Sequence, residues 1–425
     1  MGIDSIFQMN YNLCEERGGI YKNSCINTIV MRENALLNNQ NFIRRKKMKK
    51  VLIALLCVVF AIACVACLTA CGNKETYEIA VVTDVGQLMD GGFNQGTYEG
   101  AKAYAEANGK TYKYYQPANG SDATDNDRVA AMRQAVKNGA KIIVAPGFLQ
   151  AGAMETVAKE SPEVKFIFVD GWAMGLKNVT AVVYKEEESG YMAGYAAVKE
   201  GYTKLGGTFG GGGSNPACNR FAYGYAQGAS DAAKELNKTV EVKLSFQYGS
   251  GFSASPELQT QMTKWYDAGT QVIFACGGSM LQSVKAAAEL SKNGKIIGVD
   301  VDQAKESERV ITSAVKGLAV SVQKILGEYY AGEWDAKLAD KASNLGAADN
   351  ATGLPTANES WRMTNFTVEA YTALFNEIKA GTRIVKSDVS NMGKAEDGSD
   401  VDKGVNFADW WTAKFADSNV TIIFE

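Results

Sequence analysis

Short apolar runs alternate with amphipathic stretches along the chain from Glu78 onward. The runs are rich in valine, isoleucine and phenylalanine and end in Gly, Asp or other turn residues, which is typical of buried strands. The stretches between them carry apolar or small residues three to four positions apart, and this spacing indicates helices. Strands separated by single helices predict βαβ units and parallel sheets, so the expected fold class is α/β.

The pattern predicts the following elements. The expected strands are Ile79–Thr83, Tyr112–Tyr115, Lys141–Ala145, Lys165–Asp170, Thr180–Tyr184, Val240–Phe246, Gln271–Ala275, Lys295–Val299 and Val420–Phe424. The expected helices are Gly96–Ala107, Asp125–Asn138, Ala151–Glu160, Phe221–Leu236, Pro256–Ala268, Met280–Asn293, a stretch after Lys316 that reaches about Ala331, and Phe366–Ala380. The segment from Gly332 to Asn358 is polar, and the charged, glycine-bearing tail Asn391–Gly404 predicts a surface loop.

The body of the chain shows the same architecture twice. KIIVAPG (141–147) has the form of QVIFACGG (271–278), and KFIFVDG (165–171) has the form of KIIGVDV (295–301). Two similar α/β lobes that face each other would hold a ligand cleft at their interface. We expect one bilobal domain over 78–425, in which lobe 1 takes about 78–200 with part of 316–425, and lobe 2 takes about 204–312 with the remainder.

A basic stretch and a long apolar run precede this body. Six basic residues lie between positions 44 and 50, and the apolar run extends from Val51 to Ala70. Basic, then apolar, then small residues before a cleavage point make a secretory signal peptide, here 48–70. The run ends Leu-Thr-Ala-Cys71, which resembles the lipobox of bacterial lipoproteins. This resemblance implies that Cys71 is lipidated and that 71–77 tethers the body to the extracytoplasmic face of the cell membrane.

The alternative for the apolar run is a transmembrane helix, because the run has roughly the 20 residues that a span requires. The polar, charged sequence after Cys71 favours the tether. Secretory signals begin within a few residues of their basic region, so we interpret Met48 as the start. Residues 1–47 would then be a leader or a misassigned start.

The composition narrows the possible chemistry. The chain has no histidine, which removes histidine-dependent triads, the commonest zinc ligand and the usual general base. Residues 1–70 hold nine of the 44 basic and four of the 47 acidic side chains, so the rest has a net charge of about −8. An acidic body argues against nucleic acid as a partner. We expect no metal and no cofactor.

The cysteines leave one question open. Six of the eight lie at or before Cys71, and only Cys218 and Cys276 remain in the body. They could form one disulfide, but the sequence gives no distance between them. Two separate small residues in the core or in loops is the favoured interpretation, and no metal-site spacing is present.

Acidic residues gather at the ends of expected strands. The acids that follow apolar runs, or lie close behind them, are Asp84, Asp90, Asp170, Asp300 and Asp302. Open α/β sheets bind ligands in the crevice at the carboxyl ends of their strands. One such Asp is often only a helix N-cap, but three at equivalent strand ends favour a role in a cleft. Phe93 and Asn94 add an aromatic ring and an amide to the first turn.

Four consecutive glycines, Gly210 to Gly213, follow the apolar end of another strand. Their backbone N–H groups could approach a phosphate. The run lacks the Gly-Lys-Ser/Thr ending of a P-loop and the spacing of a dinucleotide fingerprint. A hinge or a tight inter-lobe turn is the favoured interpretation.

Six blocks of the sequence are similar, in this order, to blocks of the basic membrane protein family: VVTDVGQLMDGGFNQGTYEG, FIFVDG, ESGYMAGYAA, FAYGYAQGA, GVDVDQ and ITSAVKG. This family, also called purine nucleoside receptor-like, comprises the lipoprotein solute-binding components of nucleoside ABC importers. The resemblance spans roughly Glu78 to Pro355. It implies a type I periplasmic-binding-protein fold, with two Rossmann-like lobes joined by three crossovers. The lobes would close on a purine nucleoside, which ABC permease subunits would then take up.

The resemblance also implies ligand-binding roles for the residues that match the family's motifs, namely Asp84, Asp90, Phe93, Asn94, Asp170, Phe221, Asp300 and Lys316. The aromatic rings would stack on the base, while acids and amides would take the ribose hydroxyls and the ring edges. Phe and Tyr on the helices of α/β folds are usually core residues. This alternative is stronger for Phe221 than for Phe93, which follows a polar turn.

Three departures from the family pattern bear on the ligand. Met89 stands where the family usually has an acid, Gly92 where it has a serine, and the segment Gly251–Ser255 lacks the acid of the family's Gly-Ser-Phe-x-Asp block. The alternative function is therefore a lipoprotein of the same fold that binds or senses a sugar or a signal molecule. A glycoside or nucleoside hydrolase is the rival from another class, but no acid pair is fixed by a motif, so we expect no enzyme.

Overall fold

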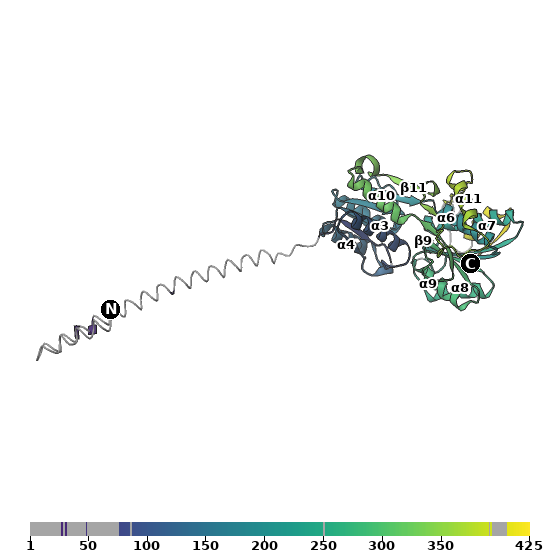
Figure 1. Cartoon of the computed structure of the whole chain (residues 1–425), viewed down its shortest axis with the longest axis horizontal. Helices are drawn as coiled ribbons and strands as arrows, with labels where there is room; N and C mark the ends of the chain where they lie inside the picture. Colours follow the sequence, from purple (N-terminus) through teal and green to yellow (C-terminus); the bar gives the residue numbers. More distant parts are fainter. Residues whose placement is uncertain are drawn as a thin grey trace. The chain divides into compact units, whose positions relative to one another are not determined.

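The computed structural model describes residues 76–85, 87–249, 251–390, 392 and 406–425, with isolated positions at 27, 28, 30, 31 and 48. The chain divides into a unit Met1–Lys74 and a compact unit Glu75–Glu425, and the second unit holds both sheets (Figure 1). The lipidation predicted at Cys71 and nearly all of the predicted leader, signal peptide and Asn391–Gly404 loop lie outside the described residues. Among the helices of the described residues, none combines the length and apolar character that crossing a bilayer requires.

The first sheet is entirely parallel. Its strands are β1 (Ile79–Val82), β2 (Tyr112–Tyr115), β3 (Ile142–Pro146), β4 (Lys165–Val169), β5 (Val179–Tyr184) and β11 (Ala342–Leu345), in the order β11-β5-β4-β3-β1-β2. Alternate side chains of each strand point to opposite faces. Ala80 and Val82 pack under α4 (Asp125–Lys137) and α5 (Ala151–Glu160), while Ile79 and Val81 pack under α3 (Phe93–Ala107) and α10 (Leu318–Tyr330). Both faces are therefore covered, as parallel sheets require.

The second sheet has an antiparallel pair at its edge. Its strands are β6 (Lys204–Phe209), β7 (Val240–Ser245), β8 (Val272–Cys276), β9 (Lys295–Asp300), β10 (Val310–Lys316), β12 (Thr352–Gly353) and β13 (Val420–Phe424), in the order β12-β10-β9-β8-β6-β7-β13. The short β12 runs antiparallel to its neighbour, β10. The flanking helices are α6 (Glu186–Glu200), α7 (Pro216–Glu235), α8 (Pro256–Asp267), α9 (Met280–Leu290), α11 (Val368–Lys379) and α12 (Asn406–Phe415). Figure 1 shows α8 beside α9 and α6 beside α7, and these are two of the closely packed helix pairs.

The chain passes three times between the two sheets. It leaves the first sheet along α6 and reaches β6, returns after β10 through α10 to β11, and passes again from β11 to β12. The predicted α/β class with two parallel-dominated sheets is confirmed. The carboxyl ends of both sets of parallel strands carry the acids that the sequence singles out.

Two helices and three strands are absent from the sequence expectations, namely α6, α12, β10, β11 and β12. The helix α6 contains the ESGYMAGYAA block, which the apolar pattern does not predict as a helix because the block is buried on nearly all sides. The polar segment Gly332–Asn358 supplies the strands β11 and β12, which are mostly too polar or too short to show an alternating pattern.

The inter-lobe hinge or turn favoured at Gly210–Gly213 is wrong. These residues form a 3-10 turn between β6 and α7, both of which belong to the second sheet and its helices. Gly211 and Gly212 have φ angles of 77° and 57°, in the left-handed region that favours glycine. A Cβ on Gly211 would lie 2.4 Å from the Cβ of Asn215, so the turn needs glycine to lead directly into α7.

Candidate ligand-binding site

A cleft of about 960 Å³ lies at the carboxyl ends of strands from both sheets. All eight residues that the family resemblance assigns to ligand binding line it: Asp84, Asp90, Phe93, Asn94, Asp170, Phe221, Asp300 and Lys316. Asp84, Asp90, Phe93, Asn94 and Asp170 come from the first-sheet side, and the other three from the second-sheet side. The strand ends thus bring together residues more than 200 positions apart, whereas their binding roles stay predictions.

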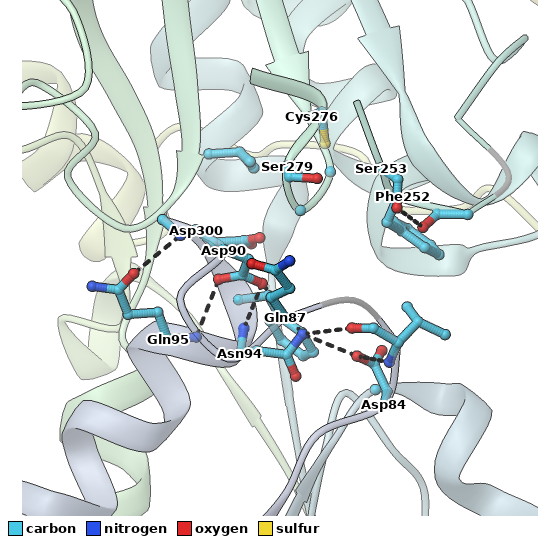
Figure 2. Close-up of a pocket in the computed structure, with 18 of the residues that line it drawn as sticks. Asp84, Gln87, Asp90, Asn94, Gln95, Phe252, Ser253, Cys276, Ser279 and Asp300 are labelled. Carbon is cyan, nitrogen blue, oxygen red and sulfur yellow. Dashed lines mark hydrogen bonds between the residues drawn. The ribbon is translucent and has the colours of Figure 1, made fainter. Parts of the chain in front are cut away.

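Asn94 holds the turn after β1 together. Its side-chain amide donates hydrogen bonds to Asp84 Oδ1 at 3.1 Å, to the Val85 carbonyl at 3.2 Å and to Asp90 Oδ2 at 3.2 Å (Figure 2). The Asn94 Oδ1 atom is buried and has no hydrogen-bond partner within the part of the chain that the structure describes. With this orientation of the amide, the donors of Asn94 are used within the turn, and its acceptor stays buried without a partner among the described residues.

Asp90 caps the helix α3. Its carboxylate accepts from the backbone N–H groups of Gly92 at 2.8 Å, Asn94 at 3.0 Å and Gln95 at 3.2 Å. Gly92 is the N-cap residue and has no side chain for this task, so Asp90 supplies the acceptors that the first turn of the helix needs. Both Asp90 oxygens are therefore occupied, which suits Asp90 to positioning the turn.

Lys316 joins the two sides of the cleft at its floor. Its ammonium donates to Asp170 Oδ2 at 2.6 Å and lies 3.5 Å from both Asp300 Oδ1 and Glu186 Oε1. Asp170 directly follows β4, and Asp300 is the last residue of β9. Both residues adopt left-handed φ angles, 57° for Asp170 and 66° for Asp300. Aspartate tolerates this region better than most residues, and such conformations concentrate at functional sites. The second Asp170 oxygen, Oδ1, is buried without a partner among the described residues.

Burial dominates the titration of the cleft acids. It raises the pKa of Asp84 to about 6, although hydrogen bonds from Val85 and Asn94 act in the opposite direction. It raises the pKa of Asp300 to about 6, although Lys316 opposes it, and it also raises the pKa values of Asp90 and Asp170. Burial alone would lower the pKa of Lys316, but the surrounding carboxylates outweigh it and raise that pKa well above its usual value.

Four phenylalanines, Phe93, Phe148, Phe221 and Phe252, line the cleft, and three of them do so in different ways. Phe93, at the first position of α3, is half-buried, and the Lys316 ammonium lies 4.9 Å from the centre of its ring. Phe221 on α7 is only 1% exposed and meets Phe274 edge to face at 5.8 Å, so most of its ring belongs to the core. Phe252, between β7 and α8, is half-buried and lines the second-sheet side of the cleft. Phe93 and Phe252 therefore offer more ring surface to a ligand than Phe221 does.

Sequence reasoning missed Phe252 and Glu186. Phe252 lies in the Gly251–Ser255 segment, which the sequence analysis considered only because it lacks the family's acid. The aromatic side chain in this segment could have indicated a residue of the site. Glu186 begins α6, is fully buried, and accepts from Arg220 Nε at 2.6 Å while facing Lys316. An acid at the start of a helix gives no sequence signal of such a role, because Glu is common in first turns.

Of the two departures in the first turn, Met89 lines the cleft, and Gly92 lies between the lining residues Gly91 and Phe93. Met89 lines it with 64% of its surface exposed. A Cβ on Gly92 would have its nearest contact at 3.6 Å, with the Gly278 carbonyl, so the space for a serine is present. Neither position disturbs the arrangement of Asp84, Asp90 and Asn94.

Cys218 and Cys276 meet in the wall of the cleft. Both thiols are free and buried, and Cys218 Sγ lies 3.9 Å from the Cys276 carbonyl oxygen. The favoured interpretation of two small buried residues without a disulfide is confirmed in this structure. The two cysteines are nevertheless neighbours, because the start of α7 packs against the end of β8 at this point.

A comparison with protein families decides what kind of protein has this fold and this cleft. Residues 77–378 match the family model of PnrA-like ABC transporter substrate-binding proteins, called Bmp. The chain belongs to this family. The Bmp family consists of substrate-binding proteins of ABC transporters, so the family resemblance inferred from the sequence blocks is confirmed.

Individual Bmp relatives extend the comparison. The chain is 30% identical over 310 residues to the ABC transporter nucleoside-binding protein BmpA of Lactococcus lactis subsp. cremoris, a match that covers 65% of this chain and 84% of that protein. It is 32% identical over 232 residues to basic membrane protein B of Borreliella burgdorferi, covering 52% of this chain and 65% of that one. A solute-binding protein of an ABC transporter system from Aeropyrum pernix K1 has a similar structure, with a TM-score of 0.61, 21% identity, and coverage of 74% and 94% of the two chains. That last likeness supports the fold.

Proposed function

We propose that this Bmp-family protein binds a purine nucleoside in the cleft and delivers it to the permease of an ABC importer. The observation that carries the proposal is one cleft that combines a phenylalanine ring from each side with buried acceptors that lack donors among the described residues. A nucleoside has a flat base with two π faces and a ribose rich in O–H donors. The name of the Lactococcus relative, a nucleoside-binding protein, agrees with this chemistry.

We place the base of the nucleoside between the rings of Phe93 and Phe252. Stacking on an aromatic side chain contributes about 1–3 kcal/mol per base. The Lys316 ammonium near the Phe93 ring holds that ring by a cation–π contact. We assign Phe221 to the floor, where its ring supports Lys316 from 5.6 Å.

The polar edge of the ligand meets acceptors. Asn94 Oδ1 and Asp170 Oδ1 are buried without partners among the described residues, and leaving such atoms unsatisfied costs about 1–3 kcal/mol each. Ring N–H and ribose O–H groups would satisfy both. Asp84 and Asp300 add carboxylates to the same wall.

The charges of the cleft favour an uncharged ligand. Among the described residues that line it, Lys316 is the cationic side chain, and it already faces Asp170, Asp300 and Glu186. A phosphate group would lie near these carboxylates, and no further cationic side chain among the described lining residues would balance its negative charge. The cleft thus suits a nucleoside better than a nucleotide.

Capture requires no covalent chemistry. The two halves close on the ligand by moving about the segments that connect the sheets, as in hinge closure. We place the protein on the extracytoplasmic side of the cell membrane, anchored by lipid on Cys71. Mass spectrometry of the membrane-extracted chain tests the anchor: a diacylated N-terminal cysteine at position 71 supports it, and an intact precursor contradicts it.

Thermal unfolding with a panel of nucleosides, free bases, sugars and amino acids tests the ligand class. A ligand at 100 times its dissociation constant stabilises a protein by about 2.7 kcal/mol. A rise of the melting temperature with nucleosides supports the proposal. A rise with a sugar and none with any nucleoside contradicts it and favours the sugar-binding alternative.

A further inference from the structure

The cleft wall contains a pair of thiols that the binding of a nucleoside does not need. Cys218 is the third residue of α7 and Cys276 is the last residue of β8. They are 7% and 1% exposed, and both line the cleft, where Figure 2 labels Cys276. Cys218 Sγ lies 3.9 Å from the Cys276 carbonyl oxygen, and the contact between the two thiols raises the pKa of Cys276 in addition to the larger effect of burial.

Their sequence context makes the pairing specific. Every other cysteine of the chain lies at or before position 71, so each thiol has only the other as an intramolecular partner in the body. If the protein is exported, as proposed above, it works in a compartment where thiol pairs are oxidised. This step rests on the proposed function.

We infer that Cys218 and Cys276 are a redox-active pair that closes to a disulfide bond in the exported protein. The oxidant is a low-molecular-weight disulfide such as oxidised glutathione. One cysteine thiolate attacks it, forming a mixed disulfide and releasing one glutathione thiol. The second cysteine then attacks the mixed disulfide and releases the other glutathione. Two thiols of the protein lose two protons and two electrons, and the reagent is reduced to two thiols.

The local backbone indicates how the pair closes. The Cys218 N–H is held by Asn215 Oδ1 at 2.9 Å, so the start of α7 is fixed. Cys276 is followed by Gly277 and Gly278, whose φ angles are 149° and 43°. Glycines allow the chain to adjust where other residues do not, so the end of β8 is the part that moves. Cys218 is the more exposed thiol and reacts with the reagent first.

A ligand in the cleft covers this pair. Phe221, Ser279 and Asp300 line the same wall as the two cysteines. If only the free protein reacts, a ligand at 100 times its dissociation constant slows oxidation about 100-fold. The rate of disulfide formation therefore reports occupancy of the cleft.

The test uses the full chain, purified in detergent under reducing conditions and then treated with oxidised glutathione. Free thiols are alkylated, the protein is digested, and peptides are identified by mass spectrometry. We expect a cross-linked peptide that joins Cys218 to Cys276, lacks two hydrogens, and separates after reduction. Circular dichroism before digestion verifies that the chain stayed folded. Recovery of both cysteines as alkylated thiols or as separate glutathione adducts from folded protein would overturn the inference.

Two controls separate this inference from the proposed function. In the variant Cys276→Ser, Cys218 should carry glutathione, in Cys218→Ser the more deeply buried Cys276 should react much more slowly, and neither variant should form an intramolecular link. Oxidation of the wild type is then repeated with excess inosine, guanosine or adenosine. Slower oxidation with one of them supports both ideas. A disulfide that forms at the same rate with all three confirms the thiol pair and counts against the nucleoside proposal.

Discussion

At the residue scale, Asn94 determines the shape of the first turn. Its amide group donates to two acids and one carbonyl that would otherwise be buried with fewer donors. Asn94→Asp replaces this donor by an acceptor between two carboxylates. We expect a loss of at least about 2 kcal/mol in the free energy of unfolding, because buried acceptors lose their partners. Urea denaturation measures it.

Asn108→Asp is a matched control for that substitution. Asn108 lies at the other end of α3 and makes an exposed hydrogen bond to the Tyr104 carbonyl. The same chemical change there should alter the free energy of unfolding by no more than about 0.5 kcal/mol. Equal losses in the two variants would contradict the role given to Asn94.

Substitutions of Phe93, Phe252 and Phe221 should have different effects on nucleoside affinity and on stability. Phe93→Ala and Phe252→Ala should each weaken nucleoside binding by about 1–3 kcal/mol, or roughly 5- to 150-fold, because each removes a stacking face. Phe221→Leu keeps most of the buried volume and should cost less than about 1.5 kcal/mol of stability while changing affinity little. Calorimetric titration measures the affinities. A larger loss of affinity in Phe221→Leu than in Phe252→Ala would restore Phe221 as the stacking partner.

The cleft acids predict a dependence of stability on pH. Burial raises the pKa of Asp300 from an ordinary 3.8 to about 6 in the folded protein. Between these values the folded chain keeps a proton that the unfolded chain releases, so the free energy of unfolding contributed by Asp300 falls as pH rises from about 4 to about 6. Asp300→Asn removes this contribution, on the order of 1–3 kcal/mol. Denaturation measured across this range should show the variant gaining stability relative to the wild type as pH rises, and a constant difference between the two would refute the assignment.

Most residues that line the first turn and the strand ends of the cleft could be predicted from the sequence, because the ends of buried strands are recognisable. Asp84, Asp170 and Asp300 stand directly after apolar runs, so their common location follows from the parallel topology. The separate roles of these residues do not follow from the topology. Neither the capping of α3 by Asp90 nor the orientation of the Asn94 amide could be predicted, because both depend on which donors and acceptors lie nearby in space.

At the element scale, the packing of α6 against α7 explains two of the family blocks. Gly190 and Gly194 of ESGYMAGYAA face the backbone of α7 at close range, and Gly224 and Gly228 of FAYGYAQGA face the backbone of α6. A Cβ on Gly194 would lie 2.0 Å from the Tyr225 carbonyl oxygen, and one on Gly228 would lie 1.9 Å from that of Tyr191. The backbones are in contact, so these helices pack without intervening side chains.

Gly194→Ala should therefore destabilise the protein strongly. The new methyl group meets backbone on a fixed helix, and overpacking of this kind costs about 1–3 kcal/mol or more. Gly327→Ala is the matched control, because Gly327 lies in α10 with its nearest contact at an ordinary 3.8 Å. That change should stabilise by about 0.5–1 kcal/mol, since alanine favours helices. Thermal unfolding measures both, and equal melting temperatures would contradict the close approach.

The sequence contains this packing signal without identifying it. Glycines four residues apart in two blocks indicate a close helix contact, but the same spacing also occurs in turns. A helix buried on nearly all sides, such as α6, has no apolar stripe to distinguish it. Similarly, β11 and β12 are recognised only through their neighbours in the sheets.

At the scale of the whole molecule, alternation of strands and helices is enough to predict two parallel-dominated sheets and a cleft at their carboxyl ends. The family comparison then states what kind of protein this is. The meeting of Cys218 with Cys276 and the position of Phe252 could not be predicted, because both depend on how a loop packs against a helix start in three dimensions.

The central claim is that the cleft recognises a base and a ribose together. Calorimetric titration of the full chain with a purine nucleoside, its free base and ribose alone tests it most directly. We predict that the nucleoside binds tightest, because stacking and the buried acceptors act on different parts of the same ligand. Ribose or another sugar that binds as tightly as every nucleoside tested would contradict the account.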